Sequence, residues 1–368
     1  MLVAGDIYDG ANRSLRAQLA FRDGLRKLAK VGIHSYVVHG NHDPLDGWAS
    51  SLVWPDEVHI FRGTKVASVP FERDGTVRAI IHGISFPRRD IRSNLARRFK
   101  ATGSKAVQIG LLHCNVGSNT GHEPYAPCKL ADLISSGMHY WALGHVHSRN
   151  ILSEGSPTVA YPGNTQGQHI NETGARGCLY VKISDTKDVE TEFIPADSLR
   201  WARESVHIGQ LDSEERLLNE LESQVECVQS KAEGRASVCR LTLRGRGSLH
   251  ATLRRSNYVE DLVGQLRDFG RGLDPLVWLD TIETQTRAAV DIEGRRQGKD
   301  FVGDCLRLIE EYRVDPTRLT SLKDTLRRLY EDRRCHKYVE MPDGEELVLL
   351  LDDAEVLCLD NLIDEDGP

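Results

Sequence analysis

Short β-rich runs in the first 150 residues lead into side chains that can bind a metal ion. The runs include HSYVVHGNHD, VRAIIHGIS, VQIGLLHCN and HYWALGHVHS, and a helical pattern over residues 14–30 precedes the first of them. The side chains are Asp6, Asn41, His42, Asp43, His113, His145 and His147. This alternation of strands and helices predicts a layered α/β domain with the polar positions at the ends of its strands.

The strand-end positions predict one shared site, although they are distant in sequence. In open α/β sheets, ligands gather outside the carboxyl ends of the strands. Carboxylate, amide and imidazole groups together suit Mn²⁺, Fe²⁺ or Zn²⁺ better than Ca²⁺. Each residue alone has a simpler explanation, because aspartate after glycine forms turns, Asn-His pairs occur in surface loops and His-x-His arises by chance. Their coincidence at successive strand ends therefore carries the prediction.

The pattern of apolar and charged residues changes along the chain and predicts four parts. Residues 1–195 form the layered α/β domain. Residues 196–290 form a smaller α+β domain, with helices at SEERLLNELESQVECVQSK and Tyr258–Phe269 and a strand at VCRLTLRGRG. Amphipathic helices follow over residues 291–340, and an acidic tail over residues 341–368 carries the apolar patches ELVLLL and EVLCLDNLI.

Charge, cysteine content and hydropathy indicate which partners and which compartment suit the protein. The net charge is −7, but residues 341–368 hold ten acidic residues and no basic one, so the remainder carries +3. A mildly basic body suits a polyanionic partner only weakly. The eight cysteines form no Cys-x-x-Cys pair, and no apolar stretch is long enough to cross a bilayer. We expect reduced thiols, a cytoplasmic protein and no membrane partner.

Four motifs in order, GDIYD, GNHD, LLHCN and GHVHS, resemble motifs two to five of the calcineurin-like metallophosphoesterases. The strings YAPC, YWALGHVHS and YPGNTQGQHINETGARGC resemble more narrowly the branch of DNA-repair exonucleases of the SbcD/YhaO type. The resemblance implies a calcineurin-like four-layer αββα sandwich for residues 1–195. It also implies that residues 196–290 are a capping domain that shapes the path of DNA, and that the protein is associated with the nucleoid.

The resemblance further implies a site for two divalent cations, which we expect to be Mn²⁺. Asp6 would bridge the two ions and His147 would bind one of them. The shell of the other ion would be completed by Asn41, His113 and His145. Two such ions polarise a phosphoryl group and activate water for attack on a phosphate ester.

Two neighbouring residues would have catalytic roles by the same resemblance. His42 would be the acid that meets the scissile phosphate and protonates the leaving group. Asp43 would hydrogen-bond His42 and fix its tautomer.

The family's first motif, Asp-x-His, has no counterpart in this chain, which begins inside what should be the second strand. We interpret the domain as N-terminally truncated. One cation position keeps four ligands, whereas the other keeps only Asp6 and His147. Because affinity rises with the number of protein ligands, we expect one strong position and one weak or empty one.

The function implied is a Mn²⁺-dependent DNA exonuclease and endonuclease. Two alternatives remain open: a phosphodiesterase or phosphatase for small substrates, and a catalytically impaired subunit that binds DNA or acts as a scaffold. Arginine-rich stretches at residues 86–100 and 240–255 could contact DNA phosphates, although each arginine could equally solvate its own helix or strand. An SbcC-type coiled-coil ATPase could dock on the helices at 300–335, and a homodimer is left open.

Overall fold

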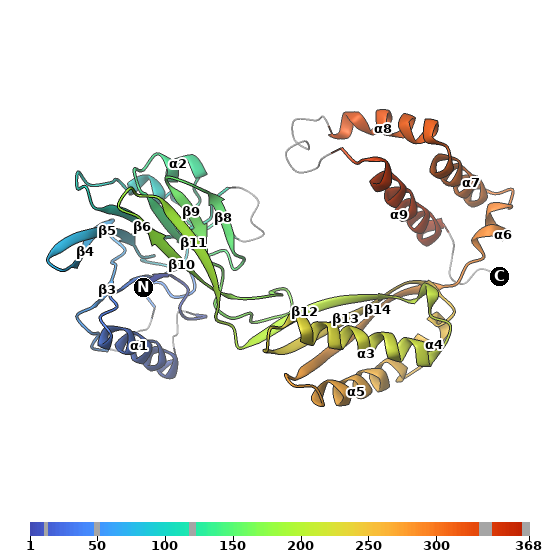
Figure 1. Cartoon of the computed structure of the whole chain (residues 1–368), viewed down its shortest axis with the longest axis horizontal. Coiled ribbons are helices and arrows are strands. Elements are labelled where there is room, and N and C mark those ends of the chain that lie inside the picture. The colour runs from blue at the N-terminus through green and yellow to red at the C-terminus, as the bar shows by residue number, and fades with distance from the viewer. Residues whose placement is uncertain (11–13, 48–51, 118–122, 331–340, 363–368) are drawn as a thin grey trace. The chain divides into compact units, whose positions relative to one another are not determined.

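The computed structural model describes residues 1–10, 14–47, 52–117, 123–330 and 341–362, and the chain divides into two compact units (Figure 1). The first unit is Met1–Trp201 and the second is Ala202–Pro368. Residues 331–340 and 363–368, which belong to the expected helical segment and acidic tail, lie outside the described residues.

Two sheets and a hairpin build the first unit. One sheet has the order β1-β2-β3 and is parallel throughout. The other has the order β4-β5-β6-β7-β9-β8, in which the four central strands are parallel and both outer strands are antiparallel. The strands are β1 (Leu2–Ala4), β2 (Ser35–Val38), β3 (Val58–Ile60), β4 (Ala67–Arg73), β5 (Thr76–Ile84), β6 (Val107–His113), β7 (Tyr140–Gly144), β8 (Asn150–Ser153), β9 (Thr158–Tyr161), and the hairpin β10 (Gly177–Ile183) and β11 (Val189–Pro195).

The helix predicted at residues 14–30 is present as α1 (Leu15–Lys30). It begins where the Ser14 hydroxyl accepts a hydrogen bond from the backbone N–H of Ala17, which caps the helix. It ends before Gly32, whose positive φ of 76° reverses the chain. The helix connects β1 to β2 and so keeps these two strands parallel.

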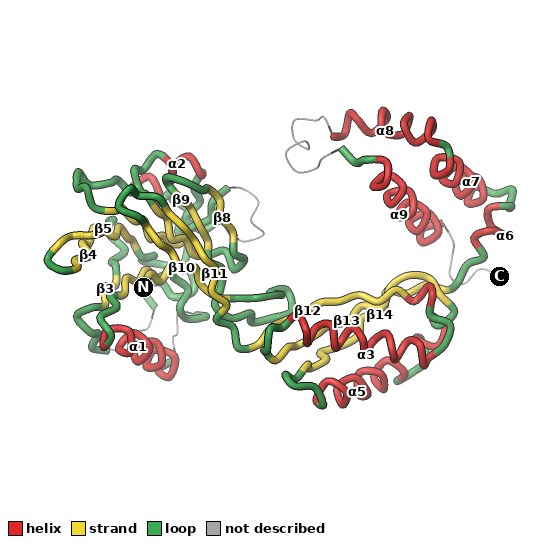
Figure 2. Tube along the Cα trace, viewed as in Figure 1, coloured by secondary structure: helices red, strands yellow, loops and turns green. Residues whose placement is uncertain are grey.

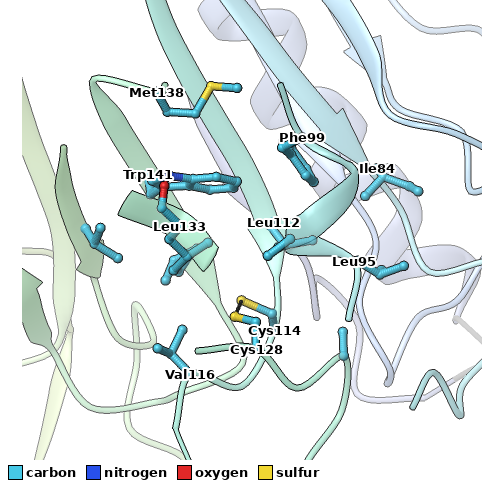
Figure 3. Packing of buried hydrophobic residues seen from close by; sticks show 14 of the residues in the cluster. Ile84, Leu95, Phe99, Leu112, Cys114, Val116, Cys128, Leu133, Met138 and Trp141 are labelled. Carbon is cyan, nitrogen blue, oxygen red and sulfur yellow. Dashed lines mark hydrogen bonds between the residues drawn. The ribbon is translucent and has the colours of Figure 1, made fainter. Parts of the chain in front are cut away.

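The six-stranded sheet has apolar side chains on both faces, which explains the nearly continuous hydrophobic runs of its central strands. Because side chains alternate along a strand, Leu111 packs toward the smaller sheet while Leu112 packs on the opposite face. Trp141 of β7 packs on the same face as Leu112, and Figure 3 shows that cluster. The same alternation directs His113, at the end of β6, to the side of Leu111, where β1 and β2 lie.

The segment RRDIRSNLARRFK, which we expected to be helical, contains only the 3₁₀ turn η1 (Ala96–Arg98). Its apolar residues Ile91, Leu95 and Phe99 are buried at helical spacing, but in an irregular backbone. Some of its polar groups are bonded outside the segment: the carbonyl of Ile91 accepts from the N–H of Ala126, and the Arg97 side chain bonds Asp132. Tertiary contacts therefore override the periodic pattern. The other helix expected in this domain, α2 (Leu130–Ile134), is present.

The second unit contains a three-stranded sheet of order β12-β13-β14 with helices on one face (Figure 2). Its elements are β12 (Leu199–His207), η2 (Ile208–Gln210), α3 (Glu214–Lys231), β13 (Ala236–Gly247), α4 (His250–Leu253), α5 (Tyr258–Arg271), β14 (Val277–Ala288), α6 (Ile292–Arg296), α7 (Phe301–Val314), α8 (Pro316–Tyr330) and α9 (Gly344–Leu362). Leu217 and Leu221 of α3 pack with Leu241 of β13 in the core of this unit.

The helices α7 and α8 lie where the amphipathic patterns predicted them, and the apolar patches of the acidic tail lie in α9. Leu347, Leu351 and Leu359 of α9 are buried. Among the described residues, a helix sufficiently long and apolar to cross a bilayer is not found. The predicted mixed α/β class, with a helical segment toward the end of the chain, is confirmed.

Candidate metal centre

Four of the predicted ligands converge where β1, β2, β6 and β7 end. Donor atoms of Asp6, His113 and His145 all lie within 4.8 Å of one another. The amide oxygen of Asn41 is 3.0 Å from Nε2 of His113. Residues separated by up to 139 positions in the sequence therefore share one site. The donors are one carboxylate, one amide oxygen and two imidazoles, a set that suits a borderline divalent cation.

Glycine precedes three of these ligands because the site has no room for a larger residue. A Cβ on Gly5 would lie 2.6 Å from Nδ1 of His113, and one on Gly144 would overlap the carbonyl oxygen of Ala4. A Cβ on Gly40 would overlap Asp6 Oδ1 and lie 2.7 Å from Cε1 of His113. Each Gly-ligand pair thus allows the backbone turn to approach its neighbours closely enough to bring the donors together.

The arrangement around His113 is one that a cation would complete. Its Nδ1 lies 2.8 Å from the carbonyl oxygen of Ala4, an acceptor, so Nδ1 carries a proton. In the neutral ring Nε2 is then a lone-pair donor, and it faces Asn41 Oδ1 at 3.0 Å and Asp6 Oδ2 at 3.2 Å. Three electron-rich atoms thus face one another, an arrangement that a second proton on the imidazole or a metal ion would stabilise. The residues present therefore fit a divalent cation.

The pKa values of this pair follow from the same contact. Burial by itself raises the pKa of Asp6, but the charge and hydrogen bond of His113, together with the N–H of His42, outweigh it and lower the pKa to about 2. Burial lowers the pKa of His113, but the Asp6 carboxylate outweighs that effect and raises it. A bound cation would compete with a proton for Nε2 of His113.

Two of the ligands have a backbone in the left-handed region. The φ angle is 51° for Asp6 and 101° for His145. Such angles are costly for residues with a Cβ and are tolerated where the surroundings fix them, as at binding sites. In His145 the ring Nε2 is held 2.9 Å from the carbonyl oxygen of Glu123. Nε2 therefore carries a proton, and in the neutral ring the lone pair is on Nδ1.

His147, the fifth predicted ligand, is held by a different contact. Its Nδ1 is 2.5 Å from Oε1 of Glu172, and it is not among the three residues whose donor atoms lie within 4.8 Å of one another. Glu172 lies in the loop between β9 and β10. Sequence reasoning missed this residue, because nothing in the glycine-rich string around it distinguishes this glutamate from a solvated one.

Asp43 is buried and anchors the two turns that carry ligands. Its carboxylate accepts hydrogen bonds from the backbone N–H groups of Asp6 at 3.2 Å, Ile7 at 3.0 Å and Gly40 at 2.7 Å. It also contacts Nδ1 of His39 at 2.9 Å. The Asp43 side chain thus ties the turn after β1 to the turn after β2.

The expected partner of Asp43 was His42, but the imidazole that the structure places against it is that of His39. His39 precedes Asp43 by four residues in the sequence. The backbone N–H of His42 donates to Asp6 Oδ1 at 2.9 Å, and its ring Nδ1 lies 3.5 Å from Oδ1 of Asp9. The His42 ring is partly exposed beside the ligands, as an acid that meets a substrate must be.

Several arginines expected to contact DNA are paired with carboxylates. Arg97 bonds Asp132 at 2.9 Å, and Arg92 pairs with Asp90 at 2.5 Å. In β13, Arg240 pairs with both Asp280 and Glu283, and Arg246 pairs with Asp360. These pairings reduce the positive charge that the two stretches present to a polyanion.

Comparison with known proteins assigns the class of this domain. Residues 1–149 match the family model for calcineurin-like phosphoesterases, and residues 201–287 match the middle domain of metallophosphoesterase YhaO. The chain belongs to the calcineurin-like metallophosphoesterases, hydrolases that use divalent metals. Within them it is of the YhaO type, as the motifs indicated.

Three relatives support this placement. The chain is 40% identical over 247 residues to the uncharacterized metallophosphoesterase YhaO of Bacillus subtilis (strain 168), covering 67% of this chain and 59% of that protein. It is 27% identical over 219 residues to the DNA double-strand break repair protein Mre11 of Aeropyrum pernix, with 53% and 51% covered. It is 26% identical over 181 residues to Mre11 of Methanocaldococcus jannaschii, with 47% and 46% covered. The chain thus spans about half to three-fifths of these relatives.

Proposed function

We propose that this protein is a Mn²⁺-dependent DNA nuclease that cleaves phosphodiester bonds from an end and within strands. The observation that carries the proposal is the convergence of Asp6, Asn41, His113 and His145 at one edge of a metallophosphoesterase domain. Two of the relatives are named as DNA double-strand break repair proteins, which favours DNA over a small substrate.

The chain's own residues would divide the work as follows. Asp6, Asn41, His113 and His145 would hold one cation, and Asp6 with His147 would hold a second. Bound cations would polarise the phosphoryl group and activate the attacking water. His42 would donate a proton to the leaving oxygen, because its partly exposed ring lies beside the ligands and its backbone N–H is fixed to Asp6. Asp43 would hold both ligand turns in register through its backbone contacts.

The test is incubation of the full chain with Mn²⁺ and end-labelled duplex DNA, with the His145→Ala variant as control. Progressive shortening of the duplex that the variant does not show supports the proposal. Cleavage of a nitrophenyl phosphodiester without attack on DNA would replace it with the small-substrate reading. Retention of DNA without cleavage would replace it with a binding or scaffolding subunit.

We further propose that α7 and α8 dock a coiled-coil ATPase of the SbcC type. The support is apolar surface on α7, where Phe301 is 68% exposed, Leu308 51% and Val314 67%. Phe301 and Leu308 are seven residues apart and so lie on one face of the helix, which favours contact with an apolar partner helix. Leu308→Asp should abolish co-purification with such an ATPase, and undiminished co-purification would contradict this assignment.

A further inference from the structure

The loop between β9 and β10 surrounds His147 with a closed set of hydrogen bonds. The ring Nδ1 of His147 lies 2.5 Å from Glu172 Oε1. The backbone carbonyl of His147 accepts from Nη1 of Arg176 at 2.6 Å and from the N–H of Asn164 at 3.0 Å. Asn164 also bonds Arg176 at 3.1 Å and Glu172 at 2.9 Å. Both the backbone and the ring of His147 are therefore fixed by this one loop.

The buried Glu172 carboxylate has hydrogen-bond partners at both oxygens. Its side chain is 7% exposed, and Oε2 accepts from Nδ2 of Asn164 at 2.9 Å and from the N–H of Gln168 at 2.8 Å. A carboxylate held in this way acts only as an acceptor. The short contact with His147 therefore requires a proton on Nδ1, and the lone pair of the neutral ring is then on Nε2.

His147 differs in this respect from the two imidazoles of the strong position. His113 and His145 each direct one ring nitrogen to a neutral backbone carbonyl, of Ala4 and Glu123 respectively. For His147 the acceptor is a buried carboxylate. A carboxylate at this place fixes the tautomer more firmly and makes the opposite nitrogen a better electron donor.

We propose that Glu172 is a positioning residue that holds His147 in the Nδ1–H tautomer and so presents Nε2 as a ligand for the second cation. The inference rests on the proposed function, since it names how one cation position of that site is built. A position with only Asp6 and His147 as protein ligands gains much of its affinity from donors that are already oriented. Glu172 would supply that orientation from 25 residues away in the sequence.

The first test reads the tautomer directly and needs no metal. In the full chain labelled with ¹⁵N-histidine, the His147 signals, assigned with His147→Ala, should show a protonated Nδ1 and an unprotonated Nε2. Glu172→Ala should convert this pattern to a mixture or to the opposite tautomer. Glu172→Gln keeps the size of the side chain and an acceptor oxygen, so it should preserve part of the preference. An unchanged His147 pattern in Glu172→Ala would overturn the proposal.

Two control variants separate this role from a general effect on folding. His169→Ala removes the other imidazole near the same carboxylate, whose Nε2 is 3.6 Å from Glu172 Oε1, and should leave the His147 tautomer unchanged. Glu192→Ala removes an exposed glutamate from β11 in the neighbouring hairpin and should also change nothing. A His147 response equal in all three variants would show that Glu172 has no specific part.

The second test is a Mn²⁺ titration followed by calorimetry. Glu172→Ala should weaken the weaker class of sites about 10- to 100-fold, as loss of a partner behind a metal ligand commonly does, and leave the stronger class unchanged. A single class of sites in the unmodified chain, or unchanged affinity in the variant, would overturn the assignment. Failure of the unmodified chain to cleave DNA, with the tautomer response intact, would instead refute the nuclease proposal alone.

Discussion

The substitution Gly40→Ala tests whether close packing positions the metal ligands. The added Cβ would overlap Asp6 Oδ1 and lie 2.7 Å from Cε1 and 2.8 Å from Nδ1 of His113. Carbon atoms in contact normally lie about 3.5 Å or more apart. The His113 ring would therefore have to retreat by about 0.8 Å, unless the backbone moves instead.

The expected loss of metal affinity follows from the small range of distances that metal coordination allows. Metal–ligand distances hold to within about 0.2 Å, so the required movement is about four times larger than a bound ion accepts. We expect the affinity of the stronger Mn²⁺ position to fall at least 10- to 100-fold, roughly the loss seen when only a supporting residue is removed. Overpacking of this kind costs about 1–3 kcal/mol of stability, which leaves a typical domain folded.

The assay is Mn²⁺ titration calorimetry combined with thermal unfolding. Gly103→Ala is the matched control, because a Cβ there would meet nothing within 4 Å and the position has no positive φ. It should bind Mn²⁺ as the unmodified chain does. A folded Gly40→Ala variant with undiminished affinity would refute the reasoning, since the ligands would then not depend on the space beside Gly40.

Three further predictions concern the site and the helices. His145→Ala should remove the stronger metal, whereas His42→Ala should abolish hydrolysis with metal content near normal; equal loss of metal by elemental analysis in both would contradict these roles. Gly24→Ala lies within α1 with nothing within 4 Å of the new Cβ, so denaturant unfolding should show a gain of about 0.5–1 kcal/mol, and a loss would contradict it. Ser213→Ala removes the hydroxyl that accepts from the N–H of Arg216 at the start of α3 and should cost about 1 kcal/mol in the same measurement; no change would show that water replaces the cap.

Local features of the sequence were sufficient for the elements whose causes are local. The helices α1 and α3 each have a serine cap and an amphipathic repeat. The cap and the repeat each depend on residues close to one another in the sequence. The strand ends that carry Asp6, Asn41 and His145 were also recognisable, because glycine next to a polar residue after an apolar run marks a turn, and His113 follows an apolar run directly. The mixed α/β class and the approximate position of the candidate site could be predicted for this reason.

Features set by distant contacts could not be predicted. The apolar spacing of Ile91, Leu95 and Phe99 indicated a helix, but the segment follows an irregular path in which some of its polar groups bond to residues elsewhere in the domain. The pairing of Asp43 with His39 depends on the shape of the turn, which the sequence does not give. Glu172 meets His147 only after the loop between β9 and β10 has folded over it.

The ligands come from two different sheets, since Asp6 and Asn41 follow strands of the three-stranded sheet while His113 and His145 follow strands of the six-stranded one. An ion bound by all four ligands would link the two sheets. Pulling the sheets apart and releasing the ion would then be one event, so the cation would protect the whole domain against unfolding. Each tenfold rise in free cation above its dissociation constant would add about 1.4 kcal/mol to that protection. A chelator would therefore lower the stability of the domain as well as abolish hydrolysis.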